Sequence, residues 1–581
     1  MKRYIKKGLV VIVASIMTTP ALAYYDVTLG TTDTAGYWNG NEWIPNGTGS
    51  TVSVNTIQSK LAQGAVTIGT GTDSDGGTDE GNITVSNALS WDANTLTLTA
   101  ANALNINAVM TAGGTAGLAI NTPPASPLGY GLINVGMGGG DFIGRVDFTG
   151  SGNTLSINGD PVRIITTLGS ESDIANGVGL QGMENYVYSV LGADIDASPT
   201  ASWNDGLGFN PLGITYQFNE FWGPFDGLGH TIDGLTINRP GEYTVGLFNQ
   251  MGCQIRNLGL TNVNIAGGAN TGAVAGITRI HEGEVANIYV TGTVTGTDIN
   301  VGGLVGHVRR GMLSNAHFDG SVSTTLTSSA TFEAAAGGLV GRLGPSEGSI
   351  ASLSNCHSSG SVSGLIAGGL VGGILDDPVT IDNCYSDATL TGSDSGGNVG
   401  GLLGWYNEVN GQSLISNSYF TGAINAPMSI IGPTITLEQY PMNVENVENG
   451  VYFNVEAPYE GSFLGELTAE PPNAFGVPLS NAQMQQQVSF VGFDFDNTWV
   501  IYEGHTAPLL RAYQGNIDSD GDGYYNNEDA FPVDDTQWLA SPNAFSFTQQ
   551  SDAVMNTVVA SNTITVSGIS AATPISIDAC S

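Results

Sequence analysis

A glycine-rich pentapeptide, GGLVG or a close variant, recurs along the middle of the chain between short stretches in which apolar and polar residues alternate. Its last glycine falls at Gly276, Gly306, Gly341, Gly372 and Gly404, so successive copies are 30, 35, 31 and 32 residues apart. Alternation with a period of two and glycine at the joins is typical of β-strands and turns, whereas a helical repeat follows a 3.6-residue period. Each repeat is therefore predicted to be a coil of short strands.

A second motif lies between the glycine motifs. It consists of an apolar residue, one spacer, an asparagine, and an apolar residue seven positions after the asparagine. The five copies are Val285/Asn287/Val294, Leu313/Asn315/Val322, Leu353/Asn355/Val362, Ile381/Asn383/Leu390 and Ile415/Asn417/Ile424. Constant offsets of this kind indicate that equivalent residues occupy equivalent places in successive coils.

One coil cannot bury its own apolar face, so neighbouring coils are expected to stack at about 4.8 Å per coil. Stacking would place four leucines of the glycine motifs in one interior column: Leu304, Leu339, Leu370 and Leu402. The sequence thus predicts an all-β chain that folds as a right-handed parallel β-helix, a solenoid of about 490 residues.

A column of aromatic residues follows two positions after each repeat asparagine: Tyr289, His317, His357, Tyr385 and Tyr419. If the strand alternates, these face outward while Ile288, Ala316, Cys356, Cys384 and Ser418 face inward. An outward aromatic stripe suits either stacking on sugar rings or ladder packing between coils, and ladder packing is favoured. His317 and His357 alone would make a weak metal site, because carboxylates with suitable spacing are missing.

The four cysteines are too few for a disulfide scaffold and lack the spacing of a zinc site. Cys356 and Cys384 occupy equivalent repeat positions 28 residues apart, so stacking would bring their Cα atoms to about 5 Å. An oxidising exterior would permit a disulfide there. Buried free thiols are a nearly equal alternative.

Composition and the first residues indicate export. Residues 1–23 combine four basic residues, an apolar stretch and Ala21-Leu22-Ala23, the pattern of a cleaved signal peptide. No stretch reaches the ~20 apolar residues of a transmembrane helix. After residue 23 the chain has 10 Lys+Arg (14 minus 4) and 52 Asp+Glu, a formal charge of −42. Such a field repels nucleic acid, which excludes nucleic-acid partners, and attracts divalent cations.

The segment DSDGDGYYNNED has the spacing of a calcium loop, in which oxygen ligands surround the ion and a glycine at position 6 permits the sharp turn. The predicted metal ligands are Asp518, Asp520, Asp522, the carbonyl of Tyr524, Asn526 and Asp529. The alternative is a plain acidic linker. Calcium is the only cofactor that the sequence predicts.

The repeats resemble a known family. GGLVG followed by SNCHSSGSVSG or DNCYSDATLTG is similar to the GLUG repeats of filamentous-haemagglutinin-like proteins and of some immunoglobulin A proteases. The resemblance extends from residue 26 to about residue 515, and AFPVDDTQW after the acidic loop resembles thrombospondin type 3 calcium repeats. Two departures stand out: the NPNG-type phrase of two-partner secretion domains and the HExxH zinc motif of the protease relatives are both missing.

An enzyme that acts on polysaccharides is the alternative from another class. Its candidate carboxylates and base are Asp194/Asp196, Asp226 with His230 and Asp233, and Asp376-Asp377. None has a convincing partner set, and Arg309-Arg310 is the only adjacent basic pair after residue 23. For Asp226 to Asp233, a turn in which the side chains bond the local backbone is the simpler interpretation. The chain is therefore expected not to be an enzyme.

The predicted divisions follow from these patterns. They are a signal peptide (1–23), a haemagglutinin-like β-helix (24–160), a β-helix segment before the repeats (161–245), the GLUG repeat β-helix (246–425), the part that closes this β-helix (426–515), a calcium-binding linker (516–540) and a truncated β-rich module (541–581).

The predicted function follows from shape and resemblance. A stiff, acidic rod at the surface of a Gram-negative bacterium, or released from it, would serve as an adhesin. Its expected partners are host or bacterial cell surfaces and extracellular glycan or matrix, with an outer-membrane secretion partner as a further possibility. The sequence names no ligand.

Overall fold

The computed structural model describes residues 24–513 with gaps, and two short strands beyond them, 546–548 and 565–567. The gaps are 72–76, 124–130, 139–140, 214–219, 327–333, 345–350, 377–378, 394–395, 409–413, 433–434, 438–447 and 464–475. The predicted signal peptide and the predicted calcium ligands at 518–529 lie outside the described residues. Within the described part of the chain, no helix has the length and apolar character needed to span a membrane.

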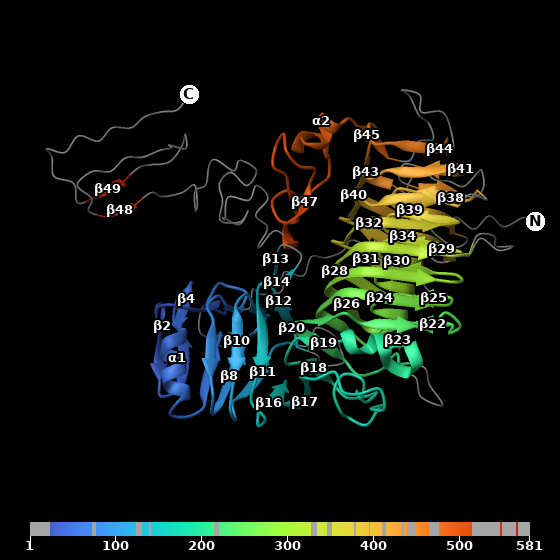
Figure 1. Cartoon of the computed structure of the whole chain (residues 1–581). Coiled ribbons are helices and arrows are strands. Elements are labelled where there is room, and N and C mark those ends of the chain that lie inside the picture. Colours follow the sequence, from blue (N-terminus) through green and yellow to red (C-terminus); the bar gives the residue numbers. More distant parts are fainter. Residues whose placement is uncertain are drawn as a thin grey trace, which may run out of the picture.

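The chain forms two β-helices. The first β-helix, here called the N-coil, stacks parallel strands in three faces around its own apolar core (Figure 1). Its elements are β1 (Val27–Gly30), β2 (Gly36–Asn39), β3 (Glu42–Pro45), β4 (Ser50–Ser53), α1 (Val54–Leu61), β5 (Val66–Gly69), β6 (Ile83–Val85), β7 (Leu89–Trp91), β8 (Thr95–Thr99), β9 (Leu104–Ile106), β10 (Val109–Ala112), β11 (Gly117–Asn121), β12 (Ile133–Val135), β13 (Met137–Gly138), β14 (Asp141–Phe142), β15 (Arg145–Phe148), β16 (Thr154–Ile157) and β17 (Asp160–Ile165).

The second β-helix, here called the repeat coil, begins after a connecting stretch and contains both repeat motifs. Its elements are β18 (Ser189–Leu191), β19 (Ile195–Asp196), η1 (Ser198–Gly206), β20 (Phe225–Asp233), β21 (Thr236–Asn238), β22 (Thr244–Val245), β23 (Phe248–Met251), β24 (Ile255–Gly267), β25 (Asn270–Thr271), β26 (Ala275–Gly296), β27 (Val301–Gly302), β28 (Val305–Thr324), β29 (Ala335–Gly337), β30 (Val340–Leu343), β31 (Ala351–Ser354), β32 (His357–Gly364), β33 (Ile366–Gly368), β34 (Val371–Asp376), β35 (Thr380–Asp382), β36 (Tyr385–Ser386), β37 (Thr389–Gly392), β38 (Asn398–Gly400), β39 (Leu403–Glu408), β40 (Leu414–Phe420), β41 (Ile424–Gly432), β42 (Ile435–Leu437), β43 (Glu448–Asn454), β44 (Tyr459–Phe463) and β45 (Val477–Leu479).

The repeat motifs stack in the predicted register. The apolar residue before each asparagine pairs with its equivalent on the next coil, from Val285 through Leu313, Leu353 and Ile381 to Ile415. The apolar residues after the asparagines align in the same way, from Val294 to Ile424. The parallel β-helix is thereby confirmed.

The predicted leucine column is also confirmed. Leu304, Leu339, Leu370 and Leu402 are fully buried, and each of the first three donates its backbone N–H to the carbonyl of the next at 2.9–3.0 Å. A glycine beside each leucine permits this close approach. A Cβ on Gly303 would lie 2.2 Å from the carbonyl oxygen of Gly338.

The repeat asparagines bend the chain at equivalent places, Asn355 and Asn383 between two strands and Asn287, Asn315 and Asn417 within one strand. All five have φ between 47° and 56°, in the left-handed region, and Asn257 one coil earlier has φ 52°. Asparagine enters this region more easily than most residues with a side chain, because its short polar group bonds locally. The conserved spacing of the motif therefore reflects a corner of the coil.

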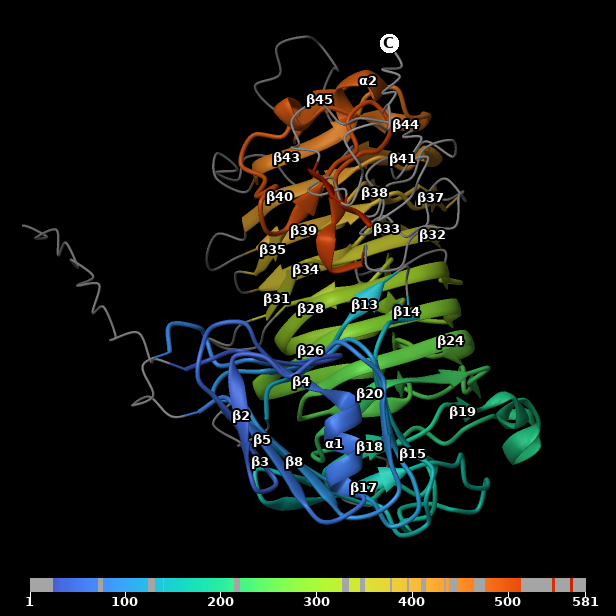
Figure 2. The ribbon, with the colours of Figure 1, turned by 90° about the vertical axis from the view of Figure 1, so that its left-hand side faces the viewer.

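The two coils meet at a corner, so the predicted single solenoid of about 490 residues was wrong: the chain forms two β-helices, each with its own apolar core. Figure 1 shows the N-coil stacked in one direction and the repeat coil in another, and Figure 2 shows the N-coil in front of the lower rungs of the repeat coil. A last segment, here called the closing segment (residues 481–513), folds back along the repeat coil from its far end. It contains α2 (Asn481–Met484), η2 (Gln487–Ser489), β46 (Trp499–Val500), β47 (Leu509–Leu510) and η3 (Arg511–Tyr513).

Beyond the closing segment, β48 (Ser546–Thr548) and β49 (Thr565–Ser567) form a parallel pair. The predicted division of the chain into seven parts stays a prediction, since the structure is continuous across several of the proposed boundaries.

Candidate functional site

The aromatic column forms a continuous ladder on the outer face of the repeat coil. Ring centroids of successive members lie 5.7, 4.7, 4.8 and 5.0 Å apart, with planes within 14° of parallel. The neighbouring residues that were expected to face inward, from Ile288 to Ser418, are fully buried in the coil. Ladder packing, the favoured interpretation, is thus confirmed.

The closing segment covers this ladder. The ring of Tyr513 packs edge-on against His317 and His357, with centroids 5.1 and 4.9 Å apart, and Trp499 packs against Tyr385 and Tyr419. Only 5% of His317 and 2% of Tyr419 are exposed. The ladder therefore offers little ring surface for stacking on sugars.

Hydrogen bonds fix the closing segment to the coil corners. The indole Nε1 of Trp499 donates to Asn383 Oδ1 at 3.2 Å, and the hydroxyl of Tyr513 donates to the carbonyl of Asn355 at 2.8 Å. The hydroxyl of Tyr419 donates to the carbonyl of Pro508 at 2.5 Å. The repeat asparagines thus both turn the coil and anchor its cover.

The ladder histidines are held between other aromatic rings. Burial lowers the pKa of His317 to about 4, and burial and the neighbouring His317 lower the pKa of His357 well below its usual range. Both rings are sandwiched between other rings. Among the described residues, no three His, Cys, Asp or Glu side chains gather as a metal site would require.

The N-coil supplies the cover over the first ladder ring. The hydroxyl of Tyr289 donates to Asp141 Oδ1 at 2.6 Å and lies 2.9 Å from Thr231 Oγ1, while the ring of Phe142 packs 5.3 Å from its ring. Burial raises the pKa of the Tyr289 hydroxyl. Strands β13 and β14 therefore join the two coils through the ladder.

The motif FDGLGH, residues 225–230, forms the main joint between the coils. The motif lies within strand β20, which pairs with β24 of the repeat coil, but Leu228 adopts φ 47° and inserts into the apolar core of the N-coil. Asp226 is buried and bonds Arg256 Nε at 2.8 Å and Asn257 Nδ2 at 2.9 Å. Burial alone would lower the pKa of Arg256, but the Asp226 carboxylate raises it overall. The pair is a buried structural ion pair.

His230 occupies the same joint. Its Nδ1 lies 3.0 Å from Asp194 Oδ1 and its Nε2 lies 2.9 Å from the carbonyl oxygen of Val146, so both ring nitrogens face oxygen atoms. The hydrogen bond from His230 lowers the pKa of Asp194.

The structure brings together some of the predicted catalytic candidates. Asp194 and His230 are in contact, but His230 is fully buried, and Asp226 is paired with Arg256 instead. Asp196 accepts from the backbone N–H of Ser198 in a turn. Asp233 bonds Thr261 and Asn262, and the pair Asp376-Asp377 has no described side chains. An enzyme that cleaves polysaccharides would need Asp194, Asp226 and His230 to converge in a solvent-exposed groove, whereas Asp226 and His230 are buried.

The repeat-coil cysteines are free thiols. Cys356 Sγ donates to the carbonyl of Ser354 at 3.1 Å, and Cys384 Sγ donates to the carbonyl of Asp382 at 3.2 Å. Burial raises the pKa of the Cys384 thiol. The structure thus supports the free-thiol alternative.

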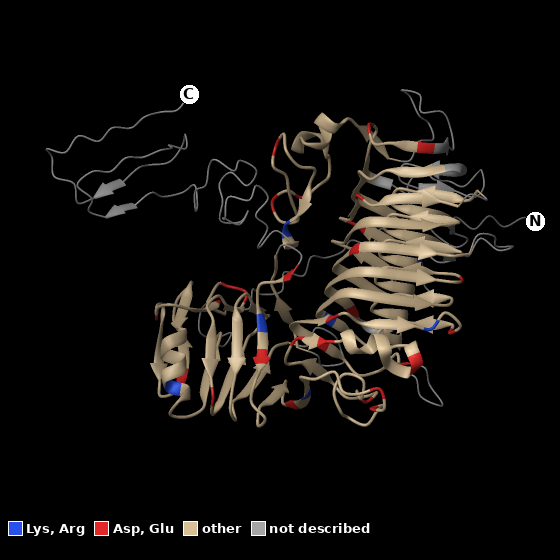
Figure 3. Cartoon of the chain, viewed as in Figure 1, with Lys and Arg blue, Asp and Glu red and all other residues tan. Residues whose placement is uncertain are grey.

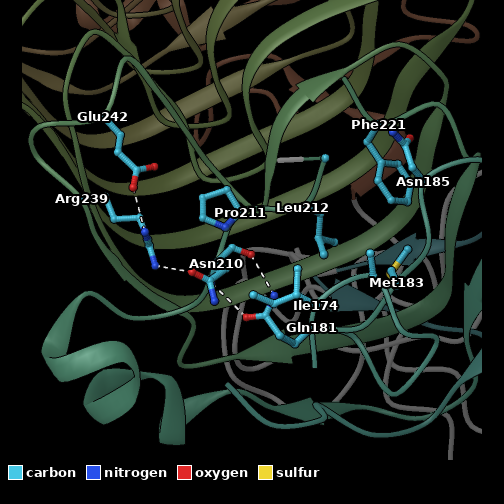
Figure 4. Close-up of a pocket in the computed structure, with 12 residues that line it drawn as sticks. Ile174, Gln181, Met183, Asn185, Asn210, Pro211, Leu212, Phe221, Arg239 and Glu242 are labelled. Atoms are coloured by element: carbon cyan, nitrogen blue, oxygen red, sulfur yellow. Dashed lines mark hydrogen bonds and ion pairs between the residues drawn. The ribbon is translucent and has the colours of Figure 1, made fainter. Parts of the chain in front are cut away.

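A pocket of about 200 Å³ opens near the start of the repeat coil. Figure 4 shows apolar side chains, among them Met183 and Phe221, beside a polar chain of contacts. Arg239 donates to Glu242 at 2.8 Å and to Asn210 Oδ1 at 2.5 Å. The side-chain amide of Gln181 donates to the backbone carbonyl of Asn210 and accepts from its backbone N–H, both at 3.0 Å. Sequence analysis missed these residues, because no motif links positions so far apart in the chain.

Comparison with known proteins finds similarity over parts of the chain and no matching family. No family model matches it, so the GLUG, haemagglutinin and thrombospondin resemblances stay predictions. Over 121 residues, 20% of the chain, it is 46% identical to halomucin of Haloquadratum walsbyi, and this stretch spans 1% of halomucin.

Two solved structures are similar to the chain. A candidate immunoglobulin A1 protease from Bacteroides ovatus is 19% identical, with a TM-score of 0.38 over 61% of this chain and 93% of that one. A second chain, named IgA1 protease, is 15% identical, with a TM-score of 0.38 over 65% of this chain and 28% of that one. Both carry the name of a protease, which corrects the expectation that the chain is not an enzyme. A likeness this distant assigns no activity to it.

Proposed function

We propose that the chain is a secreted or surface-exposed adhesin-like protein, in which two joined β-helices hold binding surfaces at fixed positions. The observation that carries the proposal is the unbroken parallel register of the repeat coil, from Val285 to Ile415. A stack in which each coil is fixed by its neighbours is stiff and presents long lateral faces. Cells, extracellular matrix and glycans are the proposed partners.

Three further observations support this proposal. The closing segment and the ion pair of Asp226 with Arg256 fix the ends and the corner of the scaffold. The stretch similar to halomucin supports a surface or secreted placement. The charge of −42 after residue 23 keeps such a scaffold soluble.

We also propose that Asp518, Asp520, Asp522, Tyr524, Asn526 and Asp529 bind calcium just after the scaffold ends. Calcium would stiffen this linker, since ligands from both halves of the loop would be held by one ion. An acidic chain also attracts the ion.

Binding assays test the adhesin-like function. Fluorescently labelled protein, residues 24–581, is applied with calcium to bacterial cells, mammalian cells and immobilised polysaccharides. We expect saturable binding to at least one of them. The matched control is Gly303→Val, which forces a side chain into the backbone of Gly338 and disrupts the stack without changing charge. The proposal would be overturned if the protein bound none of these surfaces saturably, or if the Gly303→Val control bound equally well.

A further inference from the structure

Positive charge on this acidic chain is concentrated at one place. Of the ten Lys and Arg after residue 23, four lie on neighbouring rungs of the repeat coil: Arg279, Arg309, Arg310 and Arg342. Strand register aligns Arg279 with Arg310, and aligns Arg342 with His307, two residues before Arg309. Figure 3 shows how sparse charged residues are along the strands of both coils. The fold therefore assembles a basic cluster that the sequence shows only as the pair Arg309-Arg310.

Arg309 differs from Arg279 in its ion pairing. Arg279 forms an ion pair with Glu220 at 2.8 Å, whereas Arg309 forms no salt bridge within the described part of the chain. Burial, together with the charges of Arg279 and Arg342, lowers the pKa of Arg309. Like charges held together favour a bound anion, which would relieve their repulsion.

A buried histidine contacts the cluster. The Nε of Arg309 donates to His307 Nδ1 at 3.4 Å, so the proton of the neutral ring is on Nε2. That Nε2 is buried, and only 5% of His307 is exposed. Burial and the neighbouring arginines lower the pKa of His307 well below its usual range, which keeps the ring neutral. The ring therefore positions the guanidinium of Arg309, and the guanidinium groups present the donors to an anion.

An exposed aromatic ring lies close to this cluster. Tyr243, just before β22, is 60% exposed, and its hydroxyl is near enough to influence the charge of Arg309. An aromatic face beside a guanidinium suits a sugar ring that bears a carboxylate or sulfate. Duplex DNA is a poorer fit, because it carries one negative charge per ~1.7 Å, and a chain of net charge −42 repels so dense a polyanion more strongly than a more sparsely charged polysaccharide.

We propose that Arg279, Arg309, Arg310 and Arg342 bind the anionic groups of an acidic polysaccharide, and that Tyr243 packs on one of its sugar rings. This inference rests on the proposed adhesin-like function and names the chemical class of its ligand. Carboxylated and sulfated polymers share the required chemistry, so the test includes both.

Equilibrium binding of the full chain after residue 23 tests the inference. The probes are polygalacturonate, chondroitin sulfate, neutral dextran and duplex DNA, each at low and moderate salt. We expect binding to at least one acidic polysaccharide, weakening as salt rises, and none to dextran or DNA. Arg309→Gln should weaken binding by about tenfold, because it removes a charge-assisted contact. Tyr243→Ala should weaken binding with little change in its salt dependence.

The matched control is Arg511→Gln, which makes the same charge change on the closing segment, away from the cluster. It should bind like the unchanged protein, and thermal unfolding of each variant checks that it folds. If the protein binds cells or neutral glycans but neither acidic polymer, or if Arg309→Gln and Arg511→Gln bind alike, the inference is overturned while the proposed function stands. Binding to DNA as strong as to polysaccharide would also overturn it. Binding to no surface at all would overturn both.

Discussion

The imidazole rings of His317 and His357 stack with centroids 4.7 Å apart and planes 10° from parallel, and burial keeps both rings neutral. The folded-state pKa of His317, about 4, lies below the ordinary value of 6.5. Between these values the unfolded chain binds the proton and the folded chain does not, so stability falls as pH falls through this window. The slope is up to ~1.4 kcal/mol per pH unit for each histidine.

Replacing both histidines by phenylalanine tests this dependence. The double variant, His317→Phe with His357→Phe, keeps two stacked rings and removes their titration, so its stability relative to the unchanged protein should rise between pH 7.5 and pH 5. Thermal unfolding at both pH values measures the difference. His505→Phe, at an exposed position, is the control and should show no such pH-dependent gain. A constant difference at both pH values would contradict the expectation.

Asn315 offers a test of the coil corner. Its φ of 47° is unfavourable for residues with a Cβ, and easy for glycine. Asn315→Ala should therefore lower the free energy of unfolding by about 1–2 kcal/mol, whereas Asn315→Gly should change it little. Denaturant unfolding compares the two. Equal losses for alanine and glycine would show that the side chain matters more than the backbone angle.

Trp499 is expected to hold the closing segment on the ladder. It is fully buried, stacks 4.7 Å from Phe493 and bonds Asn383. Trp499→Ala should cost about 3–5 kcal/mol of local stability, because it leaves a large cavity. Limited proteolysis should then cut residues 481–513 faster while the coil persists. Val488→Ala, at an 82% exposed residue, is the control. Equal cleavage of both variants would contradict a role for Trp499 in docking.

The ion pair at the corner predicts a non-additive result. Arg256→Met leaves the buried Asp226 carboxylate without its partner and should cost about 3–5 kcal/mol. Combining it with Asp226→Leu should recover part of that loss, since no unpaired charge remains. Thermal unfolding gives the energies, and small-angle scattering reports whether the coils keep their relative position. Simple addition of the two single losses would argue against a coupled pair.

The acidic loop predicts calcium binding. Calorimetric titration of the protein after residue 23 should show a site that is lost in the double variant Asp518→Asn with Asp520→Asn, because two carboxylate ligands are removed. Asp496→Asn with Asp494→Asn, outside the loop, makes an equal charge change for comparison. A calcium isotherm unchanged by the loop variant would place the ion elsewhere, and no heat of binding would leave the acidic-linker alternative.

Much of the repeat coil was accessible from the sequence, because each repeat meets its equivalents at constant offsets. The interior leucines, the pairing of Val285 with Leu313 and the outward aromatic column all follow from that periodicity. The charge and the calcium motif are likewise properties of the sequence alone. These features can be predicted without knowing contacts between distant segments, because each one repeats at equivalent positions of neighbouring repeats.

The corner, the cover and the basic cluster were decided only by tertiary structure. Nothing periodic connects Leu228 to the N-coil core, Trp499 to Asn383, or Arg309 to the residues around it. Each relationship joins segments far apart in the chain through side-chain shape and hydrogen bonding. The physical reason is that stacking energy repeats from coil to coil, whereas the meeting of two coils happens once and leaves no period to detect.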